Sequence, residues 1–143
     1  MGAALAFGLG MLCAAPVTAR EITPAERREI PYDSRIPACD NPSVLFDIAD
    51  RFAKREDRFW NSSLTIVSYE GLRQTSWRPW GLDYIPRRFC SGTVLVSDGV
   101  KRRIDFSVRE DLGAIGLTWG TEWCIQGLDR NYAFAPGCKQ ARP

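Results

Sequence analysis

The sequence predicts an α+β fold, in which one N-terminal amphipathic helix packs on a curled, four-stranded antiparallel sheet and two disulfides crosslink the chain. Three observations lead to this prediction. Residues 42–60 follow helical spacing, residues 64–126 contain four segments rich in strand-forming residues, and four cysteines remain once an N-terminal leader is set aside. A single helix of this kind can bury its apolar stripe against one face of such a sheet.

Residues 1–19 have the features of a secretory signal peptide. The run 3–15 is apolar but shorter than the roughly 20 residues that span a bilayer, and Val17-Thr18-Ala19 provides a cleavage site. No Lys or Arg precedes the apolar run, so a retained N-terminal anchor is the alternative. We expect cleavage after Ala19 and a periplasmic or secreted protein without an integral membrane span.

The helix follows an arm. Residues 20–40 carry three prolines and mixed charges, which predicts an extended segment, and residues 41–143 are expected to form a single α+β domain. Asn41 is a favourable N-cap and Pro42 suits the first helical position, so the helix is expected to run from Pro42 to Trp60. Its apolar face is expected to contain Val44, Leu45, Ile48, Ala49, Phe52 and Phe59.

Four strands are expected after the helix, at residues 64–69, 89–97, 101–109 and 115–126. Asp98-Gly99 joins the second to the third, because these residue types accept the backbone conformation of a tight hairpin turn. The third strand alternates apolar and polar residues, which predicts that one of its faces is buried and the other solvated.

The four cysteines outside the leader are Cys39, Cys90, Cys124 and Cys138. An even number in an exported domain predicts two disulfides, with three possible pairings, of which we favour Cys39–Cys90 and Cys124–Cys138. The alternative is a metal site made of all four thiolates, but the chain has no Cys-x-x-Cys pair. We therefore expect neither a metal nor a cofactor.

Composition excludes several classes of function. Histidine is absent, which removes His-based triads, His general bases and His-containing zinc sites. The net charge of +2 is too weak to indicate a nucleic-acid partner.

The segment 72–88 is the strongest candidate for a binding site. It is predicted to be a long loop between the first two strands, and long loops in compact domains are often functional. Its aromatic and arginine side chains can stack on sugars, contact a peptide or lie at a lipid headgroup layer. The predicted binding residues are Trp77, Arg78, Trp80, Tyr84, Arg87 and Arg88. The alternative is that the aromatic residues fold back and cap one end of the core.

The favoured function is therefore a non-enzymatic binding or accessory protein of the bacterial envelope. Its partner would be an envelope protein, a glycan or a lipid headgroup. A small glycan hydrolase that uses Glu122 with Asp105 or Glu110 is one alternative, although the sequence marks no acid–base pair. A secreted inhibitor or host-directed factor is another, because rigid, disulfide-linked loops lose little entropy on binding.

The C-terminal third carries a distinctive pattern. It reads W-G-x-E-W-C at 119–124, G-x-D-R at 127–130 and P-x-C at 136–138. Over residues 39–138 the chain resembles a group of small exported bacterial proteins that have no assigned activity. The resemblance implies a Gram-negative periplasmic setting and assigns no catalytic or binding residue.

Overall fold

The computed structural model describes residues 35–78, 85–110, 112–113 and 118–143. The helix α1 (Pro42–Trp60) is followed by the strands β1 (Ile66–Arg78), β2 (Arg87–Val96), β3 (Lys101–Arg109) and β4 (Gly120–Ile125), and by a short 3-10 helix, η2 (Lys139–Ala141). The strands form one antiparallel sheet in the order β1-β2-β3-β4. The predicted α+β fold is therefore confirmed, while the predicted leader 1–19 and residues 20–34 of the arm lie outside the described residues.

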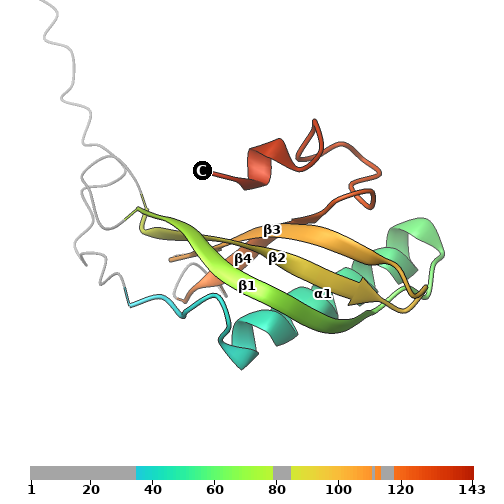
Figure 1. Cartoon of the computed structure of the whole chain (residues 1–143), viewed down its shortest axis with the longest axis horizontal. Helices are drawn as coiled ribbons and strands as arrows, with labels where there is room; N and C mark the ends of the chain where they lie inside the picture. The colour runs from blue at the N-terminus through green and yellow to red at the C-terminus, as the bar shows by residue number, and fades with distance from the viewer. Residues whose placement is uncertain (1–34, 79–84, 111, 114–117) are drawn as a thin grey trace, which may run out of the picture.

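The sheet lies between α1 on one face and the C-terminal segment on the other (Figure 1). Along β3 and β4, successive side chains point alternately toward α1 and toward the C-terminal segment. Phe106 and Trp123, which are cross-strand partners, belong to the core beneath α1, whereas Cys124 packs with Cys138 and Ala141 of the C-terminal segment.

The helix α1 has the predicted bounds because both of its ends are capped. The Asn41 side chain accepts a hydrogen bond from the Ser43 N–H at 2.9 Å, and Pro42 occupies the first turn. At the other end, Asn61 adopts the left-handed conformation (φ 47°) and its N–H bonds the Glu56 carbonyl.

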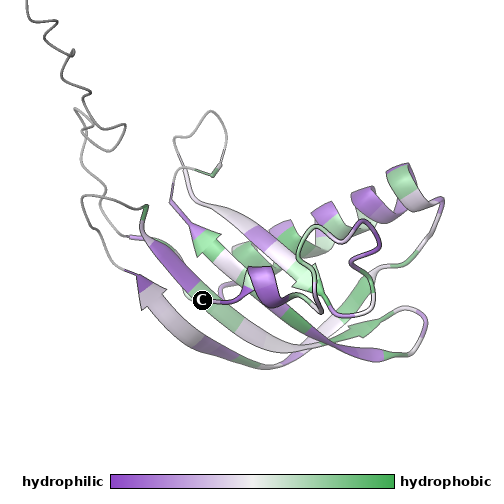
Figure 2. Ribbon diagram, turned by 90° about the horizontal axis from the view of Figure 1, so that it is seen from above, coloured by the Kyte–Doolittle hydropathy of each residue, from purple (hydrophilic) through white to green (hydrophobic). Residues whose placement is uncertain are grey.

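Hydrophobic and hydrophilic residues alternate in bands along α1 (Figure 2), and its buried stripe consists of Val44, Ile48, Phe52 and Glu56. Each buried apolar side chain contributes about 1.5–3 kcal/mol. The expectation that Phe59 belongs to this face is wrong, because its side chain is 66% exposed. Glu56 takes the last buried position instead, and Arg130 Nη1 lies 2.9 Å from its Oε2. The ion pair with Arg130 thus allows Glu56 to occupy a buried helix position at which helical spacing predicts an apolar residue.

The strand β3 has the predicted bounds, but the prediction that one of its faces is solvated is wrong. Asp105 and Ser107 are both buried, because the C-terminal segment covers this side of the sheet. Asp105, which is 2% exposed, forms ion pairs with Arg103 at 2.8 Å and with Arg142 at 3.1 Å. These pairs compensate for the burial of the carboxylate and hold the end of the chain against the sheet.

Three strands differ from the prediction in their bounds. The second differs least, because β2 covers Arg87–Val96 and the prediction was 89–97. The first runs to Arg78 instead of ending at Tyr69, because β1 continues to pair with β2 through a polar stretch. The segment 72–78 is therefore strand and not loop. The last strand, β4, covers Gly120–Ile125, which is shorter than the predicted 115–126. Residues 115–117 of that prediction lie outside the described residues.

Both favoured disulfides are present. Cys39–Cys90 links the segment before α1 to β2, and Cys124–Cys138 links β4 to the C-terminal segment. Such crosslinks persist in oxidising compartments. No helix in the described part of the chain has the length and hydrophobicity needed to cross a bilayer.

Candidate functional site

Two of the predicted binding residues, Trp77 and Arg88, are used within the fold. They are cross-strand partners, and the Arg88 guanidinium stacks 4.6 Å from the centre of the Trp77 ring. Arg88 also donates to the Pro37 carbonyl at 2.9 Å and to the Gln74 side chain. Trp77 packs against the main core. This pair therefore closes one end of the core and holds the segment that leads into α1.

Arg78 and Arg87 lie on the opposite face of the same hairpin. Their guanidinium groups stack on the buried ring of Phe89, at 5.5 and 5.6 Å from its centre. Glu122 lies 3.9 Å from Arg87 and 3.2 Å from Arg109. Burial, followed by the charge of Arg109, lowers the pKa of Arg87 from its ordinary value.

The remaining two predicted residues, Trp80 and Tyr84, lie outside the described residues. Of the other four, Trp77 and Arg88 point to the α1 side of the sheet and Arg78 and Arg87 to the other side. The structure therefore does not bring these four side chains together on one surface. A binding role for Arg78 and Arg87 stays a prediction.

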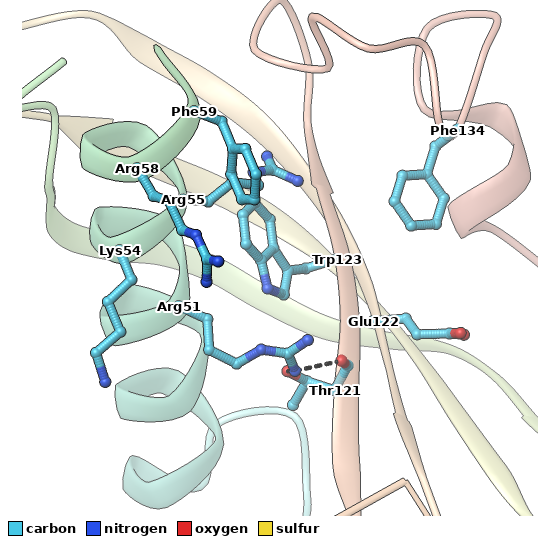
Figure 3. Close-up of a pocket in the computed structure, with 9 residues that line it drawn as sticks. All are labelled: Arg51, Lys54, Arg55, Arg58, Phe59, Thr121, Glu122, Trp123 and Phe134. Atoms are coloured by element: carbon cyan, nitrogen blue, oxygen red, sulfur yellow. Dashed lines mark hydrogen bonds between the residues drawn. The ribbon is translucent and has the colours of Figure 1, made fainter. Parts of the chain in front are cut away.

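A groove lies between α1 and β4, and we call it the basic groove (Figure 3). It has a volume of about 350 Å³ and is open to solvent. Four basic side chains come from one side of α1, and aromatic side chains lie at its rim and floor. Its lining residues are Arg51, Lys54, Arg55, Arg58, Phe59, Thr121, Glu122, Trp123 and Phe134.

Helical geometry produces the basic side of the groove. Arg51, Lys54, Arg55 and Arg58 are spaced three and four residues apart, so their side chains lie on neighbouring positions of one helix face. The helix and β4 run side by side in Figure 3, with Arg51 beside Thr121 and Arg55 beside Trp123. Arg51 Nη1 donates to the Thr121 carbonyl at 2.8 Å, which fixes the middle of α1 against the strand.

Among the described residues, carboxylates form ion pairs at only one end of this basic row. Arg51 is paired with Asp47 at 3.4 Å, and Lys54 with Asp50 at 2.6 Å. Among the residues that the structure describes, Arg55 and Arg58 form no ion pair. Glu122 points away from α1 (Figure 3). The two lining cations without an ion pair therefore lie toward the C-terminal end of α1, where the charges of Glu56 and Asp129 also act on Arg55.

Arg55 and Trp123 form the floor of the groove. The Arg55 guanidinium lies 4.0 Å from the centre of the Trp123 ring, and this ring meets Phe52 edge-on at 5.8 Å. Burial lowers the pKa of Arg55 from its ordinary value, although an arginine stays protonated in a protein. Its Nε is buried and has no hydrogen-bond partner in the described part of the chain. A cation is thus held partly desolvated at the base of the groove, where its attraction for an anion is stronger than in water.

The described lining of the groove offers charge and aromatic surface. Within the described ranges, no cluster of three or more Cys, Asp or Glu side chains is arranged to hold a metal ion. The hydroxyl of Thr121 donates to Asp47 at 2.6 Å and so has a structural partner.

Comparison with protein-family models, with curated proteins and with solved structures finds no match. The resemblance to small exported bacterial proteins therefore stays a prediction.

The sequence prediction missed the basic groove. The spacing of the four basic residues on α1 was visible, but this pattern is also typical of an ordinary solvated helix face. What distinguishes it is the position of β4 beside the helix, and Thr121 is separated from Arg51 by 70 positions. A contact between residues so far apart in sequence can be identified only once the fold is known.

Proposed function

We propose that this chain is a non-enzymatic binding domain of the bacterial envelope, located in the periplasm, and that it binds an anionic partner in the basic groove. The observation that carries the proposal is the row of four basic side chains that lines an open groove beside β4. A partner that enters this groove meets positive charge on one side and aromatic rings at the floor and rim. The two disulfides support an oxidising setting.

Charge selects the class of ligand. The exposed Lys54 and Arg58 attract anions from solution, and their long side chains can move to meet them. Arg55 is held against Trp123, so it loses little further freedom on binding. Carboxylate, phosphate and sulfate groups all match a guanidinium fork. The site thus favours an anionic group with an apolar neighbour that can lie on Phe59.

No observation favours the glycan-hydrolase alternative. Asp105 is buried and paired with two arginines, and Glu122 is paired with Arg87 and Arg109. An acid–base pair for glycoside hydrolysis needs two carboxyl groups that face a shared space for the sugar. Glu122 and Asp105 are instead engaged in separate ion-pair clusters, which supports binding over catalysis.

The proposal is tested by an NMR titration of the ¹⁵N-labelled chain with its disulfides intact. The probes are a short acidic peptide, a sulfated oligosaccharide, and vesicles that contain phosphatidylglycerol. We expect at least one probe to shift the backbone amides of Thr121 and Trp123 and the side-chain signals of Arg55 and Arg58. If no probe shifts these signals, or if the shifts gather at Arg78 and Arg87 instead, the basic groove is not the binding site.

A further inference from the structure

The segment 126–138 forms a curled loop between β4 and η2, and we call it the disulfide loop (Figure 1). The Cys124–Cys138 bond holds its two ends together. Arg130, in the first half of the loop, lies 2.9 Å from the carboxylate of the fully buried Glu56 and so ties the loop to α1. The base of the disulfide loop is therefore fixed to the rest of the fold.

Asp129 shapes the tip of the disulfide loop. Its carboxylate accepts hydrogen bonds from the Ala133 N–H at 3.1 Å and from the Phe134 N–H at 2.9 Å. Its carbonyl accepts from the Tyr132 N–H at 3.1 Å. An aspartate that bonds the following backbone in this way fixes a turn. The tip is thus ordered before a ligand arrives, and a preordered site loses little entropy on binding.

Tyr132 projects from this turn into solvent. The residue is 78% exposed, more than any other large hydrophobic residue that the structure describes. Its backbone has φ 55°, in the left-handed region that bulky residues rarely adopt. Residues held in such conformations are concentrated at ligand-binding sites. An exposed ring alone would be ordinary, but this ring also borders a pocket.

The pocket lies within the disulfide loop and has a volume of about 400 Å³. This volume is near the lower end of the range for ligand pockets, which favours a small ligand. Gly127 and Gly137 leave the backbone bare in its lining. A Cβ at Gly127 would meet no atom within 4 Å, and one at Gly137 would meet only the Gln126 amide, at 3.8 Å. A ligand can therefore approach the backbone closely.

The polar groups at this pocket include donors and acceptors of opposite charge. The Arg130 side chain is 31% exposed, and a guanidinium carries five N–H donors, so it can donate to a ligand as well as to Glu56. Each carboxylate oxygen of Asp129 accepts one N–H bond and has a second lone pair. The amide of the exposed Gln126 offers both a donor and an acceptor at the rim. The lining contains one carboxylate and one guanidinium, which favours a neutral ligand over the anions that suit the basic groove.

We propose that the pocket of the disulfide loop binds a neutral pyranose ring of an oligosaccharide, with Tyr132 as its stacking surface. The face of an aromatic ring is negative, and the C–H groups on one face of a pyranose are weakly positive, so the two faces attract. The sugar hydroxyls, which both donate and accept, would bond Asp129, Arg130 and Gln126. This site is separate from the basic groove and does not depend on the function proposed for it.

The chemistry of the pocket favours a sugar over a flat aromatic ligand. A flat ring would also stack on Tyr132, but it carries few polar groups at its edge. Asp129 and Arg130 would then lose contact with water without gaining a partner, which costs free energy. A pyranose has a hydroxyl on nearly every ring carbon and can satisfy both side chains at once.

The proposal is tested by an NMR titration of the ¹⁵N-labelled chain, with its disulfides intact, with maltose, cellobiose and diacetylchitobiose. We expect at least one disaccharide to shift the backbone amides of Gly127, Tyr132 and Gly137 while those of Thr121 and Trp123 stay in place. Mannitol carries similar hydroxyls but has no ring face, so we expect it to shift none of these amides.

Three variants identify the contribution of the aromatic ring. Tyr132→Ala is expected to weaken disaccharide binding about fivefold to tenfold, because the stacking contact is lost. Tyr132→Phe keeps the ring face and should bind nearly as the wild type does. Phe46→Ala removes an aromatic side chain of similar exposure, 73%, from α1 and should leave binding unchanged. The replaced side chains are exposed, so unchanged amide signals from the core will show that each variant is folded.

Four results would overturn the sugar site. These are the absence of loop shifts with every disaccharide, shifts confined to the basic groove, loop shifts with mannitol equal to those with the disaccharides, and equal weakening by Tyr132→Ala and Phe46→Ala. None of them bears on the binding of anions by the basic groove. Conversely, failure of the anionic probes to shift the groove would leave the sugar site in place.

Discussion

Tyr69 links the first strand to the helix through a single hydrogen bond. Its hydroxyl donates to the Leu45 carbonyl at 2.9 Å from a half-buried position on β1. Burial raises the pKa of this phenol above its ordinary value near 10, because an ionised side chain would lose its hydration there. An unfolded chain has no such barrier to ionisation.

The substitution Tyr69→Phe is expected to act differently at neutral and at alkaline pH. At pH 7 the phenol is protonated in both the folded and the unfolded state, so the variant loses only the hydrogen bond, at about 1 kcal/mol. Above pH 10 the unfolded tyrosine ionises while the folded one does not, so the stability of the wild type falls as pH rises. At pH 10.5 this effect is about 1 kcal/mol, and the variant lacks it. Urea unfolding of both proteins at the two pH values measures the difference.

A stability gap between the two proteins that is the same at pH 7 and pH 10.5 would show that Tyr69 ionises as easily in the folded state as in the unfolded state. The buried hydroxyl would then not be protected by the contact of β1 with α1.

At the scale of elements, the two disulfides close loops of different length. Cys39–Cys90 joins residues 51 positions apart, and Cys124–Cys138 joins residues 14 positions apart. In the chain-entropy account, a crosslink stabilises the fold by restricting the unfolded chain, at about 4 kcal/mol for the longer loop and about 3 kcal/mol for the shorter one. All four cysteines are buried, so their replacement by alanine changes packing to a similar extent.

We therefore expect Cys39→Ala/Cys90→Ala to lower the free energy of unfolding by about 1 kcal/mol more than Cys124→Ala/Cys138→Ala. Each double variant serves as the control for the other in urea denaturation. A larger loss for the shorter loop would mean that the attachment of the C-terminal segment, and not the restriction of the unfolded chain, dominates.

The elements also show how far the sequence could predict the fold. The bounds of β3 were predicted correctly because apolar and polar residues alternate from Lys101 to Arg109. Those of α1 were predicted because Asn41 and Asn61 cap its ends. The extension of β1 to Arg78 was not predictable, since its second half is mostly polar, with only Leu72 and Trp77 packed against the core, and gains its strand structure by pairing with β2.

Burial was harder to predict than element type. Alternation on β3 indicates one apolar face, but it cannot reveal that the C-terminal segment covers the polar face. Likewise, helical periodicity identifies Phe59 as apolar, but it cannot reveal that Arg130 pairs with a buried Glu56 while Phe59 is exposed. Both differences arise from contacts between segments far apart in sequence.

At the scale of the whole molecule, the candidate site in the structure differs from the predicted one. The sequence indicated the end of the β1–β2 hairpin, whereas the basic groove lies between α1 and β4. Trp77 and Arg88 were predicted as ligand contacts because aromatic and arginine side chains serve binding, but the same chemistry joins them to each other. The basic residues that line the groove are on α1. Lys54 and Arg58 are exposed, and Arg55 is supported by Trp123.

The most direct test of the basic groove is a calorimetric titration of the wild type and two matched variants with a short acetylated peptide of alternating glutamate and valine. Lys54→Gln/Arg58→Gln removes two exposed charges from the groove, and Arg73→Gln/Lys139→Gln removes two exposed charges elsewhere. Both variants therefore have the same net charge. At roughly 0.5–0.7 kcal/mol for each exposed ion pair, we expect the first variant to bind about fivefold to tenfold more weakly than the wild type and the second to bind as the wild type does. Equal weakening by both variants would show that the peptide responds only to net charge and would contradict a binding site in the basic groove.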